Sequence, residues 1–199
     1  MNASAIVLAG GRSSRMGADK AQLDFGGVPI LRRVAHELAR RFAEIIVVVA
    51  PDGAGIERAG VKLIHDEEQF AGPLEALRRG LLASSNAIAF ACSCDLPLMK
   101  AELATRLCEL IGDHDAAIPL VDGREQVLCA AYRRDAAGKI AGLIARGEKR
   151  MLALLDELNV RGVDAAELRN IDPQLRSFIN VNTPEDYARA LAIFRASQI

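Results

Sequence analysis

The sequence predicts an α/β fold of three layers, α/β/α, built around a mostly parallel mixed sheet. Strand-sized apolar runs alternate with amphipathic helical patterns through the first 110 residues. The runs are continuously apolar, as is typical of parallel strands that are buried on both faces. The pattern is less regular after residue 110, so we expect other strand directions to join the sheet there.

Short apolar runs bounded by turn residues mark the expected strands. The clearest is Ile45–Val49, because five consecutive β-branched residues favour an extended backbone. The expected strands are Ala5–Leu8, Leu23–Phe25, Ile45–Val49, Val61–Ile64, Ala87–Cys92, Ala116–Pro119 and an antiparallel Gln126–Tyr132.

Apolar residues at helical spacing mark the expected helices. Pro29 opens a helix whose apolar face carries Leu31, Val34, Leu38 and Phe42. Further helices are expected from Gly72-Pro73, over Leu103–Leu110, over 135–158 with a break near Gly147, and from Thr183-Pro184, where Thr183 is a good N-cap. We find no repeat or linker and expect one domain, residues 1–199.

The composition excludes several classes of protein. The chain of 199 residues is 51% apolar and 26% charged, which allows a substantial core, and its net charge of -1 argues against a nucleic-acid partner. The N-terminus lacks the basic region of a secretory signal, and no apolar run is long enough to cross a membrane. Four cysteines without a CxxC pair favour buried, reduced thiols over a zinc site, as expected for a cytoplasmic protein.

The stretch LAGGRSSRMGADK, residues 8–20, follows the first expected strand. Gly10 and Gly11 allow a ligand to approach the backbone closely, and the nearby cations Arg12, Arg15 and Lys20 suit a polyphosphate. The stretch fits neither GxxxxGK[ST] nor GxGxxG, which disfavours Walker-type NTP hydrolysis and hydride transfer. The alternative is an ordinary turn with solvated basic residues.

Carboxylate and amide side chains follow later elements. Asp95 comes after the strand 87–92, at the same sheet edge as the glycine pair, and could bind Mg²⁺ or simply cap a turn. Asp66 follows the strand 61–64, where a solvated charge is the alternative. Asn180 and Asn182 alternate, so they face one side; they could bind a substrate or merely end a strand before the helix cap.

LAGGRSSRMGADKAQL resembles the signature of the molybdenum cofactor guanylyltransferases, a branch of the nucleotidyltransferases with a Rossmann-like, glycosyltransferase-A-like fold. CDLP and FINVNTPEDY, later in the chain, resemble further segments of that family. The resemblance implies transfer of GMP from GTP to Mo-molybdopterin, with Mg²⁺ as cofactor and pyrophosphate as the second product. It leaves open, as further partners, apo-molybdoenzymes or their chaperones.

The resemblance also implies a role for particular residues. It assigns the nucleotide to Leu8, Ala9, Gly10, Gly11, Lys20, Asp66 and Asp95. It assigns catalysis to Arg15, Lys20 and Asp95, the metal to Asp95, and molybdopterin to Asn180 and Asn182. The attacking phosphate monoester is already largely dianionic at pH 7, so no general base is needed and the scattered histidines are not expected to act.

Three departures from the family pattern leave the base specificity open. Val49 replaces an Asn, Glu75-Ala76 replaces Ala-Gly, and Val127 and Cys129 replace a Pro and a His. The sequence therefore keeps two alternatives. One is a related transferase that uses CTP or a sugar 1-phosphate, and the other is a non-catalytic protein that binds the nucleotide or the cofactor.

Overall fold

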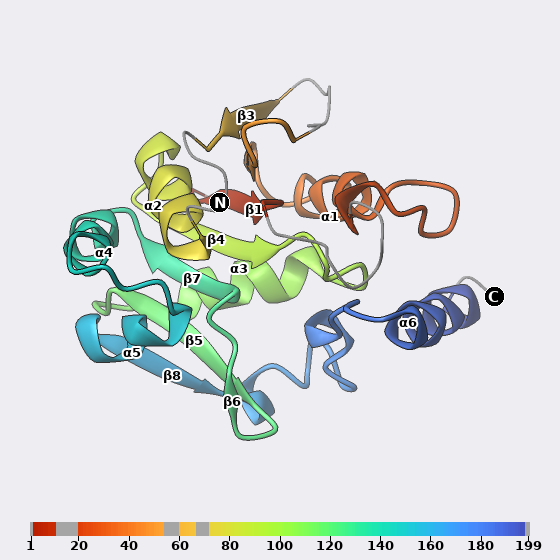
Figure 1. Cartoon of the computed structure of the whole chain (residues 1–199). Coiled ribbons are helices and arrows are strands. Elements are labelled where there is room, and N and C mark those ends of the chain that lie inside the picture. The colour runs from red at the N-terminus through yellow and green to blue at the C-terminus, as the bar shows by residue number, and fades with distance from the viewer. Residues whose placement is uncertain (1, 11–19, 54–59, 67–71, 198–199) are drawn as a thin grey trace.

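The structure is a computed structural model of the chain, and it describes residues 2–10, 20–53, 60–66 and 72–197. Its centre is an eight-stranded mixed sheet with helices on both faces (Figure 1). The strand order is β3-β2-β1-β4-β7-β5-β6, and β8 pairs with β5 beside this path. This arrangement confirms the predicted α/β class and the mixed sheet.

The strands are short, as the apolar runs predict. Their bounds are β1 Ser4–Leu8, β2 Glu44–Val49, β3 Val61–His65, β4 Ile88–Ser93, β5 Ala116–Val121, β6 Arg124–Glu125, β7 Cys129–Arg133 and β8 Val160–Asp164. The α-helices are α1 Ile30–Leu38, α2 Pro73–Ala83, α3 Ala101–Leu110, α4 Ala136–Ala145, α5 Leu154–Glu157 and α6 Pro184–Ala196. Short 3-10 turns are η1 Lys20–Gln22, η2 Met151–Ala153, η3 Ala165–Glu167 and η4 Arg176–Phe178.

Strands β3, β2, β1 and β4 form the parallel half of the sheet. Along β1, Ala5 and Val7 pack into the core on one face, whereas Ile6 and Leu8 pack into the core on the other. Both faces of the sheet are therefore buried, which explains why these strands are continuously apolar and do not alternate with polar residues.

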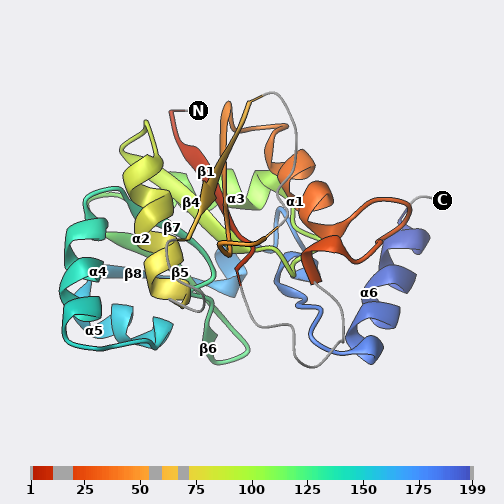
Figure 2. The same ribbon diagram turned by 45° about the horizontal axis from the view of Figure 1, so that its top comes forward.

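The helices divide between the two faces (Figure 2). Residues of α1, α3 and α6 pack with Val7 in one core, and residues of α2, α4 and α5 pack with Ile6 in the other. This division is the predicted three-layer arrangement. The last helix begins as predicted, because Thr183 and Asp186 form a capping box.

Two strand predictions need correction. Leu23–Phe25 is not a strand: the chain turns through Gly26 and Gly27, both with positive φ, and only an isolated bridge joins Asp24 to Pro29. The strand expected at Gln126–Tyr132 is antiparallel, as predicted, but begins at Cys129. Gln126 instead belongs to a turn, in which the Cys129 N–H donates to its carbonyl.

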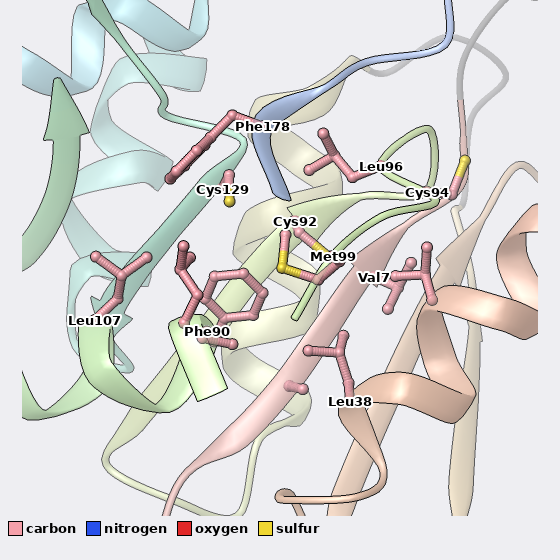
Figure 3. Close-up of a cluster of buried hydrophobic side chains, with 14 of the residues drawn as sticks. Val7, Leu38, Phe90, Cys92, Cys94, Leu96, Met99, Leu107, Cys129 and Phe178 are labelled. Atoms are coloured by element: carbon pink, nitrogen blue, oxygen red, sulfur yellow. The ribbon is translucent and has the colours of Figure 1, made fainter. Parts of the chain in front are cut away.

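The four cysteines are free and buried, which confirms the prediction of buried thiols. Cys92, Cys94 and Cys129 lie in the apolar cluster that also contains Phe90 and Met99 (Figure 3). Burial raises the pKa of the Cys92 and Cys129 thiols well above the ordinary value. These thiols therefore stay protonated at neutral pH and act as packing groups.

Candidate functional site

The strand order reverses next to β1. From β1 the chain passes through α1 to β2 on one side, and it later returns through α2 to β4 on the other. Since α1 and α2 cover opposite faces, the carboxyl ends of β1 and β4 form the topological switch point of the sheet. In open α/β sheets, ligands bind at such a switch point. Gly10 follows β1 and Asp95 follows β4, so both border this edge.

Backbone hydrogen bonds fix the end of β1. The Ala9 N–H donates to the Val48 carbonyl at 2.7 Å, and the Leu8 carbonyl accepts from the Cys94 N–H at 3.0 Å. The Leu8 side chain is buried in the core with α2. A ligand at this edge would therefore meet the backbone that follows Leu8 and not its side chain.

Gly10 lies close to Asp66 and to the end of β2. A Cβ atom at Gly10 would stand 3.3 Å from the Ala50 nitrogen and 3.4 Å from Asp66 Oδ2. The Asp66 N–H donates to the Val49 carbonyl at 2.8 Å, which fixes this carboxylate directly after β3. The structure thus brings together two predicted nucleotide residues, Gly10 and Asp66, and a side chain at position 10 would crowd them.

Asp66 is a buried carboxylate with an open acceptor. Its side chain is only 7% exposed, and Oδ1 has no hydrogen-bond partner among the described residues. Burial raises the pKa of Asp66; nearby Arg79 opposes this shift and nearby Glu75 adds to it. A buried acceptor without a partner costs stability and suits a ligand that brings an N–H or O–H donor.

We expect Asp66→Asn to stabilise the unliganded protein at pH 7 by about 1 kcal/mol, a rise in melting temperature of about 2–4 °C. The raised pKa means that the folded state favours the protonated carboxyl. Its stabilising contribution is complete below the unfolded pKa of about 3.9 and is lost as the pH rises through the folded pKa. The advantage of the variant should therefore shrink between pH 7 and pH 4, as thermal unfolding by circular dichroism would show.

Asp115→Asn is the matched control for this prediction. A hydrogen bond from Lys139 lowers the pKa of Asp115, so its contribution to stability is present above the unfolded pKa and is lost as the pH falls. The Asp115 variant should be less stable than the original protein at pH 7. An Asp66 variant that is less stable than the original at pH 7 would contradict the account of this carboxylate.

Asp95 lies in a cavity of about 320 Å³. Its carbonyl accepts a hydrogen bond at 2.9 Å from the N–H of Val181, the residue between Asn180 and Asn182. Both asparagines line the same cavity as Asp95. Three of the predicted site residues, from two segments far apart in the sequence, therefore meet beside the switch point.

Asn180 and Asn182 do not end a strand. They lie in an extended segment between η4 and α6, and the Asn182 N–H donates to Asp186 in the cap of α6 at 3.3 Å. The fold thus holds the backbone of Asn182 and leaves both side chains exposed at the cavity.

Sequence reasoning missed Gln126 and Glu125, which also line the cavity of Asp95. Gln126 had a signal, because it directly precedes Val127, one of the departures from the family pattern. Of the remaining predicted residues, Gly11 and Arg15 lie outside the described residues. Lys20 begins η1, but the placement of its side chain lies outside the description.

The three departures from the family pattern lie in different surroundings, and Val127 lines the cavity of Asp95. Val49 and Ala76 are each 1% exposed, and their side chains pack in opposite cores. Cys129 forms part of the cavity wall beside Asp95. Glu75 accepts two hydrogen bonds of 2.7 Å from Arg78 and stays partly exposed. Of Val49, Glu75 and Ala76, Glu75 is thus the residue whose side chain lies outside the two cores.

The residues at this edge fit a hard divalent cation that keeps substrate ligands. Within the described part of the chain, no group of three or more His, Cys, Asp and Glu is placed to hold a metal. Asp95 and Glu125 both line the cavity, and Asp95 is the one that follows a parallel strand at the switch point. One or two carboxylates with substrate phosphates and water are a usual Mg²⁺ arrangement. The described helices include none that is long and apolar enough to cross a membrane.

Comparison with known proteins gives a consistent result. Residues 5–161 match the family model described as "MobA-like NTP transferase domain". A protein of Mycobacterium avium named "Probable molybdenum cofactor guanylyltransferase" is 40% identical over 98% of both chains. One with the same name from Methanosarcina mazei is 37% identical over 92% of this chain and 87% of its own.

Solved structures agree with these relatives. The molybdopterin-guanine dinucleotide biosynthesis protein A of Archaeoglobus fulgidus superposes with a TM-score of 0.83 and 27% identity, over 98% of this chain and 100% of that one. The 2-C-methyl-D-erythritol 4-phosphate cytidylyltransferase of Thermus thermophilus has a TM-score of 0.74 over 98% and 100% of the two chains, but only 18% identity. The second likeness extends to the fold alone.

Proposed function

Since this chain belongs to the family of MobA-like NTP transferases, we propose that it acts as a molybdenum cofactor guanylyltransferase with GTP and Mo-molybdopterin as substrates. The reaction joins GMP to the terminal phosphate of molybdopterin and releases pyrophosphate. The observation that carries this proposal is the cavity in which Asp95 meets Asn180 and Asn182 beside the switch point. It offers one carboxylate for a metal and two amides for a second substrate at a single place.

GTP is assigned to the β1 side of the switch point. The backbone at Ala9, Gly10 and Gly11 approaches the nucleotide, and Arg15 and Lys20 supply positive charge to its phosphates. The open Oδ1 of Asp66, close to Gly10, is suited to accept a hydrogen bond from the nucleoside. The second substrate is assigned to Asn180 and Asn182.

The reaction needs positioning and charge neutralisation more than proton transfer. An oxygen of the molybdopterin phosphate attacks the α-phosphorus of GTP, and the bond from that phosphorus to the pyrophosphate oxygen breaks. The attacking phosphate is already largely dianionic at pH 7, so no side chain has to remove a proton. Arg15 and Lys20 would stabilise the charge that develops on the phosphates, and Asp95 is the residue that would hold Mg²⁺.

The magnesium ion, when bound, neutralises phosphate charge as a Lewis acid. The histidines agree with a reaction that lacks a general base. His36 lies on α1, His65 ends β3 and His114 lies in the turn after α3, so they do not form one catalytic group.

Release of pyrophosphate tests this function. With Mg²⁺ and Mo-molybdopterin, GTP should release pyrophosphate, while CTP and ATP should release little. Release from CTP in place of GTP would favour a cytidylyltransferase. Tight binding of GTP without release would favour a protein that only binds and delivers the cofactor. The proposed setting is the cytoplasm, where apo-molybdoenzymes or their chaperones would receive the product.

A further inference from the structure

A second cavity, of about 580 Å³, adjoins the cavity of Asp95. The two cavities share Gln126 and Asn180 in their walls, so they are direct neighbours. The larger one lies beside the β5–β6 hairpin, whose turn is Asp122-Gly123. Any substrate whose phosphate reaches Asp95 from the side of Asn180 therefore has room for the rest of its body here.

Two arginines from separate parts of the fold line the larger cavity. Arg124 lies on β6, and Arg169 lies in the irregular segment after η3. Neither forms an ion pair within the described residues, and Arg169 donates one hydrogen bond of 2.8 Å, to the Pro173 carbonyl. Two guanidinium groups against the single acid Asp122 give the cavity a positive balance, which suits an anionic ligand.

The backbone around this cavity is unusual. In the described chain, the non-glycine residues with positive φ are Asp122, at 50°, and Leu175, at 51°, and both line the cavity. Left-handed backbone is costly for residues with a side chain and persists where the surrounding structure enforces it. Buried Phe178 adds an apolar surface to the wall of this cavity, which suits a ligand with a flat ring system.

We propose that this second cavity binds the pterin and metal end of molybdopterin, and that Arg124 and Arg169 contact its anionic oxo-metal group. This inference rests on the proposed function and deepens it. The phosphate of the substrate would lie beside Asp95 and Asn182, its body would pass Gln126 and Asn180, and its metal end would reach the two arginines. Planar guanidinium groups bind oxyanions through paired hydrogen bonds.

The test measures equilibrium binding of Mo-molybdopterin by isothermal titration calorimetry, without transfer. Arg124→Ala and Arg169→Ala should each raise the Kd for Mo-molybdopterin about tenfold, as expected for a hydrogen bond to a charged group. The Kd for GTP with Mg²⁺ should not change. Arg124→Lys and Arg169→Lys should recover part of the affinity, and metal-free molybdopterin should be much less sensitive to all four changes.

Arg106→Ala is the matched control, because Arg106 is an exposed arginine on α3 that pairs with Glu109. It should leave both dissociation constants unchanged. The inference is overturned if the arginine variants melt at the original temperature and bind Mo-molybdopterin as tightly as the original chain. Failure of the proposed function would give a different result. The original chain would then bind Mo-molybdopterin but would not release pyrophosphate from GTP. A chain that does not bind Mo-molybdopterin at all would overturn both.

Discussion

Asp95→Ala is expected to reduce GMP transfer by about 10³-fold while the protein stays folded. Asp95 lines the cavity of Asn180 and Asn182 at the end of β4, and we propose that it binds the magnesium ion. Without Asp95, the protein would bind Mg²⁺ more weakly. The negative charge that develops on the phosphates would then lack its main counter-charge. The variant keeps the Asp95 carbonyl, which accepts the hydrogen bond from Val181, so the strand end should retain its shape.

Initial rates of pyrophosphate release at several Mg²⁺ concentrations would measure this effect. Asp95→Asn, which preserves the shape and removes the charge, should be nearly as impaired as the alanine variant. Asp113→Ala, an exposed acid after α3, is the control and should transfer at the original rate. Original rates and an unchanged Mg²⁺ dependence in the Asp95 variants would remove this residue from the mechanism.

Lys20→Ala is expected to lower the transfer rate by about 10²-fold and to weaken GTP binding. Lys20 is the last cation of the loop that follows β1, and it begins η1. The next residue, Ala21, is 2% exposed in the core that α1 helps to form, so the backbone next to Lys20 is anchored in that core. A point charge held there suits the phosphates of GTP.

Lys20→Arg tests whether charge alone is sufficient, since the planar guanidinium is larger than an ammonium group; we expect only partial recovery. Lys149→Ala, an exposed lysine after α4, is the control for a general loss of positive charge. If Lys20→Ala lowers the melting temperature and the rate in proportion, Lys20 is a structural residue and the proposed role is wrong.

The parallel half of the fold was predictable because its strands are buried on both faces. Ile45–Val49 and Ala5–Leu8 show this burial directly in their composition, and each falls within the observed strand. β8, Val160–Asp164, was missed because its sequence VRGVD mixes apolar, charged and glycine residues, as befits a strand with only one buried residue. Leu23–Phe25 has the composition of a strand, but the glycines that follow turn the chain too early for pairing.

The site was predictable in part. Residues that follow parallel strands share one sheet edge, which places Gly10, Asp66 and Asp95 near one another without knowledge of the family. The meeting of Asp95 with Asn180 and Asn182 depends on a backbone hydrogen bond between segments 86 residues apart, 95 to 181, which no local pattern reveals. Arg169 lies in an irregular segment, so its place in the second cavity could come only from the structure.

A crystal structure of the protein with GTP and Mg²⁺ tests the central claim most directly. We expect the triphosphate to lie against the backbone of Gly10 and Gly11, with the metal bound between a phosphate and Asp95, and with Asp66 Oδ1 accepting a hydrogen bond from the nucleoside. Nucleotide bound at another surface, with the edge between β1 and β4 empty at saturating GTP, would contradict it.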